Sequence, residues 1–334
     1  MKKTFIIAEA GVNHNGSINV AKKLIDAAVD CNADAIKFQT FITENIVCKN
    51  TKKAPYQNKN SLTKETQYEM LKSLELTKSQ YIQIFDYCCL KKIKFLSTPF
   101  DEESVDFLDK LGLNIYKISS GDITNYPLLL KIAKLKKKII LSTGMSYFDE
   151  ITSAVNLILN NGTKKNNLSI LHATSAYPCP YNEVNLLSMI ALQKKYKLNI
   201  GYSDHTNGIS IPIAAVSLGA KIIEKHLTLN KNMKGPDHKA SLNPIEFKKM
   251  ITEIRNIELA IGNDKKIPSK TEKKNIKFAR KYIVASKKIN KGDIFSNHNL
   301  TTKRSGGGIN PMNWNNIIGK RANQDFEIDQ IIKL

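Results

Sequence analysis

Residues 201–237, which decide how this chain folds, read GYSDHTNGISIPIAAVSLGAKIIEKHLTLNKNMKGPD. His205 and His226 each lie in a short polar cluster that directly follows an apolar run typical of a buried strand. Residues 208–219, between the clusters, have the length and apolar character of one crossover helix closed by a glycine. Because a strand, a helix and a strand of this size form a right-handed parallel unit, we expect both histidines on neighbouring strands at one edge of the sheet.

Two imidazoles aimed at one point make half of a metal site. A single histidine near a strand end is more often a hydrogen-bonded residue beside the core. Here the pair is framed by three carboxylates, Asp204, Glu224 and Asp237, which favours a cation site. The spacing alone leaves both interpretations open.

The same alternation of apolar runs and helical patterns extends outward through the first 260 residues. The expected strands are residues 5–8, 35–38, 94–96, 115–118, 139–141, 168–171, 198–200 and 221–223. The expected helices are residues 18–30, 78–90, 102–111, 127–135, 149–159 and 183–196, with a last one near 244–260. Eight such repeats favour a closed (β/α)8 TIM barrel, although periodicity cannot exclude an open doubly wound α/β sheet.

The domain organisation follows from length and composition. A barrel of this type takes about 250 residues, so residues 1–261 are expected to form the TIM-barrel domain. Residues 262–274 are polar and lysine-rich and are interpreted as a linker, and residues 275–334 are expected to form a small second domain. A domain of that size is only marginally stable alone, which favours docking on a partner surface.

The charge is strongly basic, with a formal net charge of +21 and a pI of about 9.6. The excess is nearly all lysine, because the only arginines are Arg255, Arg280, Arg304 and Arg321. Arginine is the usual side chain for forked recognition of phosphates and base edges, so no nucleic-acid partner is expected. The charge is interpreted as a solvated surface that helps to attract anionic substrates.

The five cysteines are odd in number and lack metal-type spacing, which favours reduced thiols in a cytoplasm. No apolar run approaches the length of a membrane span, and the first residues lack a signal-peptide core. A cytoplasmic protein with no membrane partner is therefore expected.

Polar side chains recur where a barrel enzyme places them, at the carboxyl ends of strands. Lys37 and Lys117 lie in or beside apolar strands, where an unpaired ammonium would be costly. Together with hydroxyls from Thr98, Ser120 and Ser142, they predict a pocket for a phosphate group. No glycine-rich nucleotide loop follows the first strand, so a nucleotide cofactor is not expected.

A set of short motifs gives the chain a family resemblance. The motifs are AEAGVNHNG from Ala8, KFQT from Lys37, LSTPF from Leu96, STGM from Ser142, YSDHT from Tyr202, EKH from Glu224 and GPDH from Gly235. In this combination the chain resembles the sialic acid synthases, which join phosphoenolpyruvate to an N-acetylated amino sugar. The resemblance covers nearly the whole chain, and residues 275–334 are similar to the antifreeze-like SAF domain of these enzymes, including Lys303-Arg304.

The resemblance implies a TIM barrel, a divalent metal, usually Mn²⁺ with Mg²⁺ or Co²⁺ possible, and a homodimer with a swapped second domain. It also implies roles for individual residues. They are Glu9, Asp122 and Glu224 in catalysis; His205 and His226 as metal ligands; Lys37, Thr98, Lys117, Ser120, Ser142 and Ser203 around phosphoenolpyruvate; and Ser175, Tyr177, Asp237 and the partner's Arg304 around the sugar.

Two positions depart from the family pattern. Asp122 stands where a glutamate is usual, and Ser175 stands where sialic acid synthases usually have asparagine. The first concerns the reach of the acid/base group and the second the identity of the sugar. Residues 53–57 and 182–186 are more similar to the legionaminic acid branch.

The expected reaction joins phosphoenolpyruvate, water and an open-chain N-acetylated amino sugar, with release of phosphate by C–O cleavage. The acceptor is N-acetylmannosamine or 2,4-diacetamido-2,4,6-trideoxymannose, and the product is N-acetylneuraminate or N,N'-diacetyllegionaminate. Alternatives are a pseudaminic acid synthase or another phosphoenolpyruvate-dependent sugar acid synthase. Further alternatives are a Schiff-base aldolase that uses Lys117 or Lys225 and a non-enzymatic carbohydrate- or ice-binding protein.

Overall fold

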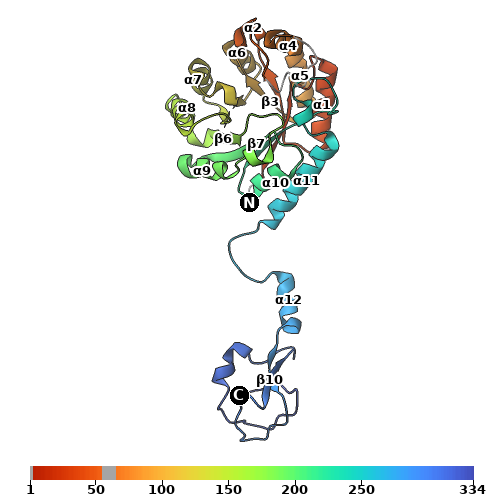
Figure 1. Cartoon of the computed structure of the whole chain (residues 1–334), viewed down its shortest axis with the longest axis vertical. Coiled ribbons are helices and arrows are strands. Elements are labelled where there is room, and N and C mark those ends of the chain that lie inside the picture. The colour runs from red at the N-terminus through yellow and green to blue at the C-terminus, as the bar shows by residue number, and fades with distance from the viewer. Residues whose placement is uncertain (1–2, 55–64) are drawn as a thin grey trace. The chain divides into compact units, whose positions relative to one another are not determined.

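The computed structural model describes residues 3–54 and 65–334. The chain divides into two compact units, Met1–Gly262 and Asn263–Leu334. The last residues of the expected linker are helical, because helix α12 (Lys270–Ala279) begins within it. Figure 1 shows the first unit as a ring of helices around a set of strands.

The first unit is a closed barrel of eight parallel strands in sequence order. Strand β1 pairs with both β2 and β8, so the barrel closes and the open-sheet alternative is wrong. The strands are β1 (Phe5–Gly11), β2 (Ala35–Thr40), β3 (Lys94–Pro99), β4 (Ile115–Ile118), β5 (Lys138–Ser142), β6 (Leu168–Ala173), β7 (Asn199–Asp204) and β8 (Ile222–His226).

Helices surround the barrel and follow most of the expected boundaries. They are α1 (Ile18–Asp30), α2 (Thr43–Ile46), α4 (Gln67–Leu74), α5 (Lys78–Leu90), α6 (Glu102–Lys110), α7 (Tyr126–Lys134), α8 (Phe148–Asn160), α9 (Leu187–Tyr196), α10 (Ser210–Ser217) and α11 (Pro244–Ala260). The helix expected from residue 183 begins only at Leu187, since Tyr181–Glu183 form a separate 3-10 turn. Helices α2 and α4 were not expected, because their segment is mostly polar and its apolar residues do not recur at helical spacing over a long stretch.

Several strands continue beyond the apolar runs that predicted them. The run at residues 221–223 becomes a strand that ends at His226, and the run at 198–200 becomes one that ends at Asp204. The added residues are polar but still pair with neighbouring strands. Hydrophobicity therefore marks the start of each strand and underestimates its carboxyl end, where the polar side chains gather.

Strict alternation of side chains divides the core into two layers. Outward residues such as Ile6, Phe38 and Tyr202 pack beneath the helices. Inward residues fill the bottom of the barrel, and these are Ile7, Ala35, Leu96, Ile140, Leu171 and Ile222. A residue two positions further along a strand faces the same way, so the side chains above this layer also point into the barrel.

The second unit has its own small core. Strands β9 (Tyr282–Ala285) and β10 (Leu300–Lys303) pair antiparallel, and the 3-10 helix Pro311–Asn316 follows. Phe295 and Phe326 pack at its centre with Ile283 and Leu300.

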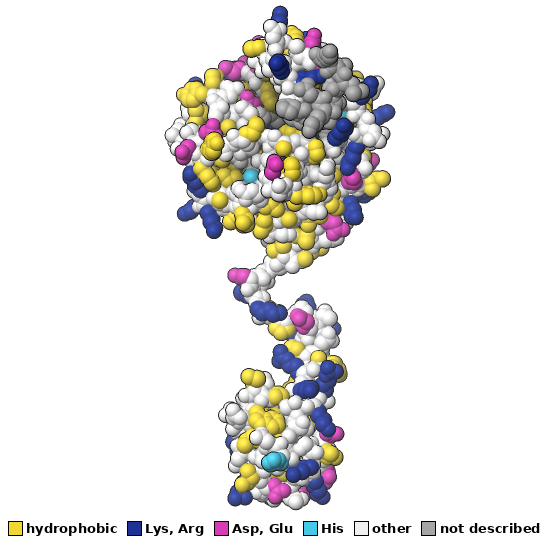
Figure 2. Space-filling model, in the orientation of Figure 1, with side chains coloured by type: hydrophobic (Ala, Val, Ile, Leu, Met, Phe, Trp, Pro, Cys, Tyr) yellow, Lys and Arg dark blue, Asp and Glu magenta, His cyan; other side chains and the backbone are white. Residues whose placement is uncertain are grey.

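On the face shown in Figure 2, lysine and arginine side chains are spread over both units, with acidic side chains among them. In the described part of the chain, no helix has both the length and the apolar character needed to cross a membrane.

Candidate active site

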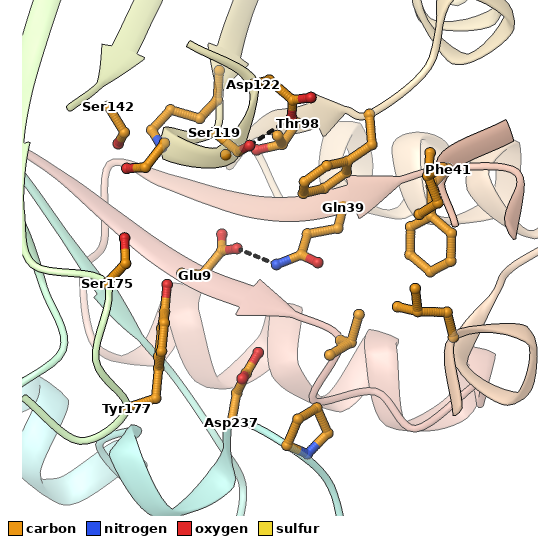
Figure 3. A pocket seen from close by; sticks show the side chains of 18 of the residues that line it. Glu9, Gln39, Phe41, Thr98, Ser119, Asp122, Ser142, Ser175, Tyr177 and Asp237 are labelled. Atoms are coloured by element: carbon orange, nitrogen blue, oxygen red, sulfur yellow. Dashed lines mark hydrogen bonds between the residues drawn. The ribbon is translucent and has the colours of Figure 1, made fainter. Parts of the chain in front are cut away.

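A cavity of about 610 Å³ opens at the carboxyl ends of the barrel strands. The site residues expected in the first unit all line it, and these are Glu9, Lys37, Thr98, Lys117, Ser120, Asp122, Ser142, Ser175, Tyr177, Ser203, His205, Glu224, His226 and Asp237. Arg304 lies in the second unit, just after β10, and its side chain is exposed. Figure 3 shows Glu9 between Ser175 and Tyr177 on one side and Phe41 on the other.

Four buried charged side chains form a chain across the floor of the cavity. Lys37 Nζ lies 2.8 Å from Glu9 Oε2 and 3.7 Å from Glu224 Oε2. Lys117 Nζ lies 3.4 Å from Glu224 Oε1. None of the four residues is more than 5% exposed. Each ammonium thus faces a carboxylate, which offsets the cost of burying its charge.

These contacts shift the pKa values in different directions. Burial disfavours the charged form of Lys37, but Glu224 and Glu9 outweigh it and raise the pKa of this lysine. Burial lowers the pKa of Lys117 and raises that of Glu9. Burial also opposes the charge of Glu224, yet Lys117 and Lys37 prevail and lower its pKa to about 2. Glu224 is therefore a carboxylate at neutral pH.

Hydroxyl groups surround the two lysines. Thr98 Oγ1 accepts a hydrogen bond from Lys37 Nζ at 3.1 Å, and Ser203 Oγ donates to Glu224 Oε1 at 2.9 Å. Ser120 Oγ accepts from the Gly144 amide at 2.9 Å, so its own proton can be donated elsewhere. Ser142 Oγ is buried and has no hydrogen-bond partner among the described residues. The cavity thus presents two cations and unused hydroxyl donors to one region, a set that suits a phosphate group.

The two histidines lie side by side with ring centroids 5.6 Å apart. His205 Nδ1 lies 2.7 Å from the Thr174 carbonyl oxygen, so Nδ1 carries the proton and the Nε2 lone pair is available. His226 Nδ1 is buried without a hydrogen-bond partner in the described part of the chain. Burial lowers the pKa of both rings, which favours the neutral form that binds metals.

The donor set fits a divalent cation that keeps other ligands. Within residues 3–54 and 65–334, no group of three or more histidine, cysteine or acidic side chains is arranged to hold a metal ion. The protein would supply two imidazoles and leave the remaining positions to water and substrate. A hydrogen bond from the ring Nδ1 to a backbone carbonyl, as in His205, is the usual device that orients a metal-binding imidazole.

Asp122 lies in the short 3-10 turn Ser120–Asp122 after β4. Its carboxylate accepts hydrogen bonds from Ser119 Oγ at 2.6 Å and from Asn125 Nδ2 at 3.1 Å. Burial raises its pKa despite these two bonds. Figure 3 shows Asp122 beside Ser119 on the rim above Glu9. The shorter side chain is thus held by its own turn and still lines the cavity.

Tyr177 and Asp237 lie on the side of the cavity near the histidines. The Tyr177 ring centroid is 4.1 Å from that of His205 and 6.0 Å from that of His226. Burial, with a smaller contribution from Glu9, raises the pKa of Asp237 to about 7. Ser175 lies close to Gly144, where an added Cβ would be 2.5 Å from Ser175 Oγ.

The sequence-based list of site residues omitted some lining residues. Gln39 Nε2 donates to Glu9 Oε1 at 3.4 Å, and its place two residues after Lys37 could have indicated an inward side chain. A group of apolar side chains also lines the cavity, namely Val12, Phe41, Ile46, Val47, Met70, Leu71, Leu74 and Phe100. We call this group the apolar wall. Much of it belongs to α2 and α4 and the loops beside them, which the pattern of residues did not indicate.

Lys225 does not line the cavity. Its side chain is fully buried, and its ammonium pairs with Asp204. It is therefore not available as a Schiff-base nucleophile. Residues 55–57, part of the segment similar to the legionaminic acid branch, lie outside the described residues.

Comparison with known proteins decides the family. The model of the NeuB family matches residues 24–266, and the model of the SAF domain matches residues 280–334. The chain belongs to the NeuB family. It is 54% identical over 333 residues to the N,N'-diacetyllegionaminic acid synthase of Campylobacter jejuni subsp. jejuni serotype O:2, with 100% of both chains covered.

Other relatives agree with this assignment. The N,N'-diacetyllegionaminic acid synthase of Legionella pneumophila subsp. pneumophila is 43% identical over 324 residues, which cover 96% of this chain and 91% of that one. The crystal structure of N-acetylneuraminic acid synthetase from Leptospira borgpetersenii serovar Hardjo-bovis is 35% identical, with a TM-score of 0.72 and coverage of 83% and 91%. This NeuB-family chain is a nonulosonic acid synthase, and the expected TIM barrel and SAF domain are confirmed.

Proposed function

We propose that this NeuB-family enzyme condenses phosphoenolpyruvate, water and open-chain 2,4-diacetamido-2,4,6-trideoxymannose to N,N'-diacetyllegionaminate and phosphate. One observation carries the proposal. Two buried lysines with their hydroxyl donors and two neutral imidazoles line the same cavity, which also has an apolar wall.

In this proposal Lys37 and Lys117 bind the phosphate of phosphoenolpyruvate. Thr98, Ser120, Ser142 and Ser203 orient it through hydroxyl groups. An arriving phosphate competes with Glu9 and Glu224 for the ammonium groups, so the lysines stay neutralised in both states. Each ammonium group therefore has an anionic partner both before and after phosphoenolpyruvate binds.

A divalent cation held by His205 and His226 would polarise the aldehyde oxygen of the sugar, and Mn²⁺ is our first choice, with Mg²⁺ or Co²⁺ as alternatives. Carbon 3 of phosphoenolpyruvate then attacks carbon 1 of the sugar. Glu9 accepts a hydrogen bond from Gln39 and forms an ion pair with Lys37. Its carboxylate would orient a water molecule beside the cation.

Positive charge develops on the former enol carbon as the carbon–carbon bond forms. Glu224 remains ionised beside both lysines and would stabilise that charge. Water adds to this carbon, and Asp122 would take up one of its protons and pass it to the alkoxide that the aldehyde oxygen has become. The tetrahedral intermediate then collapses to the ketone as its C–O bond to phosphate breaks, and the second water proton leaves with the phosphate. Ser119 and Asn125 hold Asp122 at the cavity rim during this step.

The apolar wall supports the proposed acceptor. The trideoxy sugar carries a methyl group at carbon 6 and two acetamido methyl groups, all of which gain by leaving water. N-acetylmannosamine would place a hydroxyl group at carbon 6 against Phe41, Met70, Leu74 or Phe100. A hydroxyl without a partner in such surroundings is costly.

Tyr177, Ser175 and Asp237 would bind the polar part of the sugar.

We also propose that the enzyme is a homodimer in which Arg304 of one subunit contacts the N-acetyl group bound by the other. All five cysteines are free thiols, which supports a cytoplasmic location.

The direct test measures phosphate release from phosphoenolpyruvate with each of the two sugars, using protein treated with EDTA and then supplied with Mn²⁺. We expect release that needs Mn²⁺ and a higher kcat/KM for the trideoxy sugar. Equal rates for both sugars would contradict the proposed acceptor. Full activity after exhaustive EDTA treatment would contradict the role of the cation.

The swapped dimer has its own test, since Arg304→Ala and His205→Ala damage different units of the chain. Each variant alone should be inactive. In a mixed dimer one site combines an intact barrel with an intact Arg304 from the other subunit, so about a quarter of the wild-type sites should work after equal mixing. If Arg304 acts within its own chain, the mixture stays inactive.

A further inference from the structure

A buried ion pair lies directly behind the two histidines. Asp204 and Lys225 are opposite each other in the register of β7 and β8, and they form the last pair of that ladder. Each precedes a histidine in sequence, Asp204 before His205 and Lys225 before His226. Lys225 Nζ lies 2.5 Å from Asp204 Oδ2, and both side chains are fully buried.

Both members of this pair make further hydrogen bonds. Asp204 Oδ1 accepts from the Tyr202 hydroxyl and the Thr206 amide, each at 3.1 Å. Asp204 Oδ2 accepts from Thr206 Oγ1 at 3.1 Å in addition to Lys225. Lys225 Nζ also donates to the Thr206 carbonyl oxygen. Lys225, a single residue of β8, therefore binds both neighbours of His205 in the sequence, the side chain of Asp204 and the carbonyl oxygen of Thr206.

Alternation separates this network from the reaction. Ser203, His205, Glu224 and His226 line the cavity, whereas Asp204 and Lys225 do not. The ion pair therefore touches no part of the proposed substrate site. The pair joins the ends of β7 and β8, next to the two residues that carry the imidazoles, so it can fix the position of both strand ends.

Stability alone does not explain why an ion pair is buried at this position, because a buried ion pair often adds little to the free energy of unfolding. Apolar residues of similar volume are often as stable as such a pair, while loss of one partner is strongly destabilising. The geometry points to another role. We propose that the Asp204–Lys225 pair is a positioning device that fixes the spacing of His205 and His226 and so sets the affinity for a divalent cation. The inference rests on the proposed function in one respect, that the two imidazoles bind a cation.

The test measures Mn²⁺ binding directly, by electron paramagnetic resonance on EDTA-treated full-length protein without substrates. The double variant Asp204→Asn with Lys225→Met removes both charges and leaves no unpaired one. We expect it to bind Mn²⁺ about 10- to 100-fold more weakly, the range known for outer residues of metal sites. Binding of phosphoenolpyruvate in EDTA, followed by tyrosine fluorescence, should stay within about twofold, since Lys37 and Lys117 are untouched.

Two further variants keep the test decisive. Tyr202→Phe removes one hydrogen bond to Asp204 without unpairing a charge, so it should fold even if the double variant does not, and it should weaken Mn²⁺ binding a few-fold. Arg255→Met is the matched control, because it breaks the partly buried Arg255–Asp34 pair, whose 3.1 Å bond lies away from the cavity. It should lower thermal stability and leave Mn²⁺ affinity unchanged.

The His205→Ala variant separates the two possible failures. If it binds Mn²⁺ like the wild type, the proposed cation site is wrong, and the inference falls with it. If it loses Mn²⁺ while the double variant and Tyr202→Phe keep wild-type affinity, the ion pair has no positioning role and the proposed function stands. Weaker binding in all three, with an unchanged Arg255→Met control, supports the inference.

Discussion

The two sides of the active-site cavity are built in different ways. The polar side consists of side chains from the barrel strands and from the loops at their carboxyl ends, and its strand residues Lys37, Lys117 and Glu224 are joined by ion pairs. The apolar wall is formed largely by α2 and α4, which sit between β2 and β3, and its members pack as a separate small cluster. The residues proposed to act on every acceptor sugar thus lie on or next to the rigid barrel strands. The apolar wall, which would contact the part that differs between sugars, lies in a segment inserted between two strands.

This division makes a simple claim. Changes to the strand side should damage the reaction with every acceptor, whereas changes to the apolar wall should alter the choice of acceptor. The following predictions test that claim.

The largest effect is expected for His205→Ala. Loss of one imidazole removes a cation ligand, and phosphate release should fall by about 10³-fold or more with either sugar. The fold should survive, because the ring lies at the cavity surface, where water can fill its place. Steady-state kinetics and circular dichroism of the same sample measure both quantities. A loss confined to one sugar would contradict the division.

A smaller effect on both sugars is expected for Asp122→Asn. If Asp122 takes a proton from water, turnover should fall by about 10²-fold. Its pKa is raised by burial, so the wild-type rate should fall with decreasing pH at a pH above the ordinary 3.8 of an aspartate. The variant cannot ionise and should lose this acidic limb. The pH profile of kcat distinguishes the outcomes, and a change of less than a few-fold would assign Asp122 to structure.

The smallest effect, and the most selective, is expected for Met70→Gln in the apolar wall. A polar end group disfavours the methyl-bearing sugar, so kcat/KM for that acceptor should fall about tenfold relative to N-acetylmannosamine. Met189→Gln is the matched control, because Met189 is buried on α9 and does not line the cavity. Both variants should lose stability, but only the first should change the ratio. An equal shift in the control would show that the wall does not select the acceptor.

Much of the barrel could be predicted from local patterns. The apolar runs predicted all eight strands, because a strand buried on both faces needs a continuous hydrophobic stretch. The same runs missed the last residues of several strands. Asp204 and Glu224 are strand residues by hydrogen bonding, but they are polar because they surround a reaction site.

The role of Lys225 shows where local reasoning ended. Alternation along the strand indicates that Lys225 points outward, because its neighbours Glu224 and His226 point inward. The local sequence does not show which residue neutralises its charge. The partner that neutralises it, Asp204, lies 21 positions earlier in the chain. Only the pairing of β7 with β8 brings them together.

The sequence by itself determined the number and order of the strands, the edge at which the polar residues gather and the family to which the chain belongs. These follow from local periodicity and from motifs, each of which is complete within a few residues. Tertiary structure alone decided that the barrel closes, that α2 and α4 add an apolar wall, and which carboxylate neutralises each buried lysine. Closure, shared cavities and ionisation depend on distances between residues far apart in the chain, and no local pattern contains those distances.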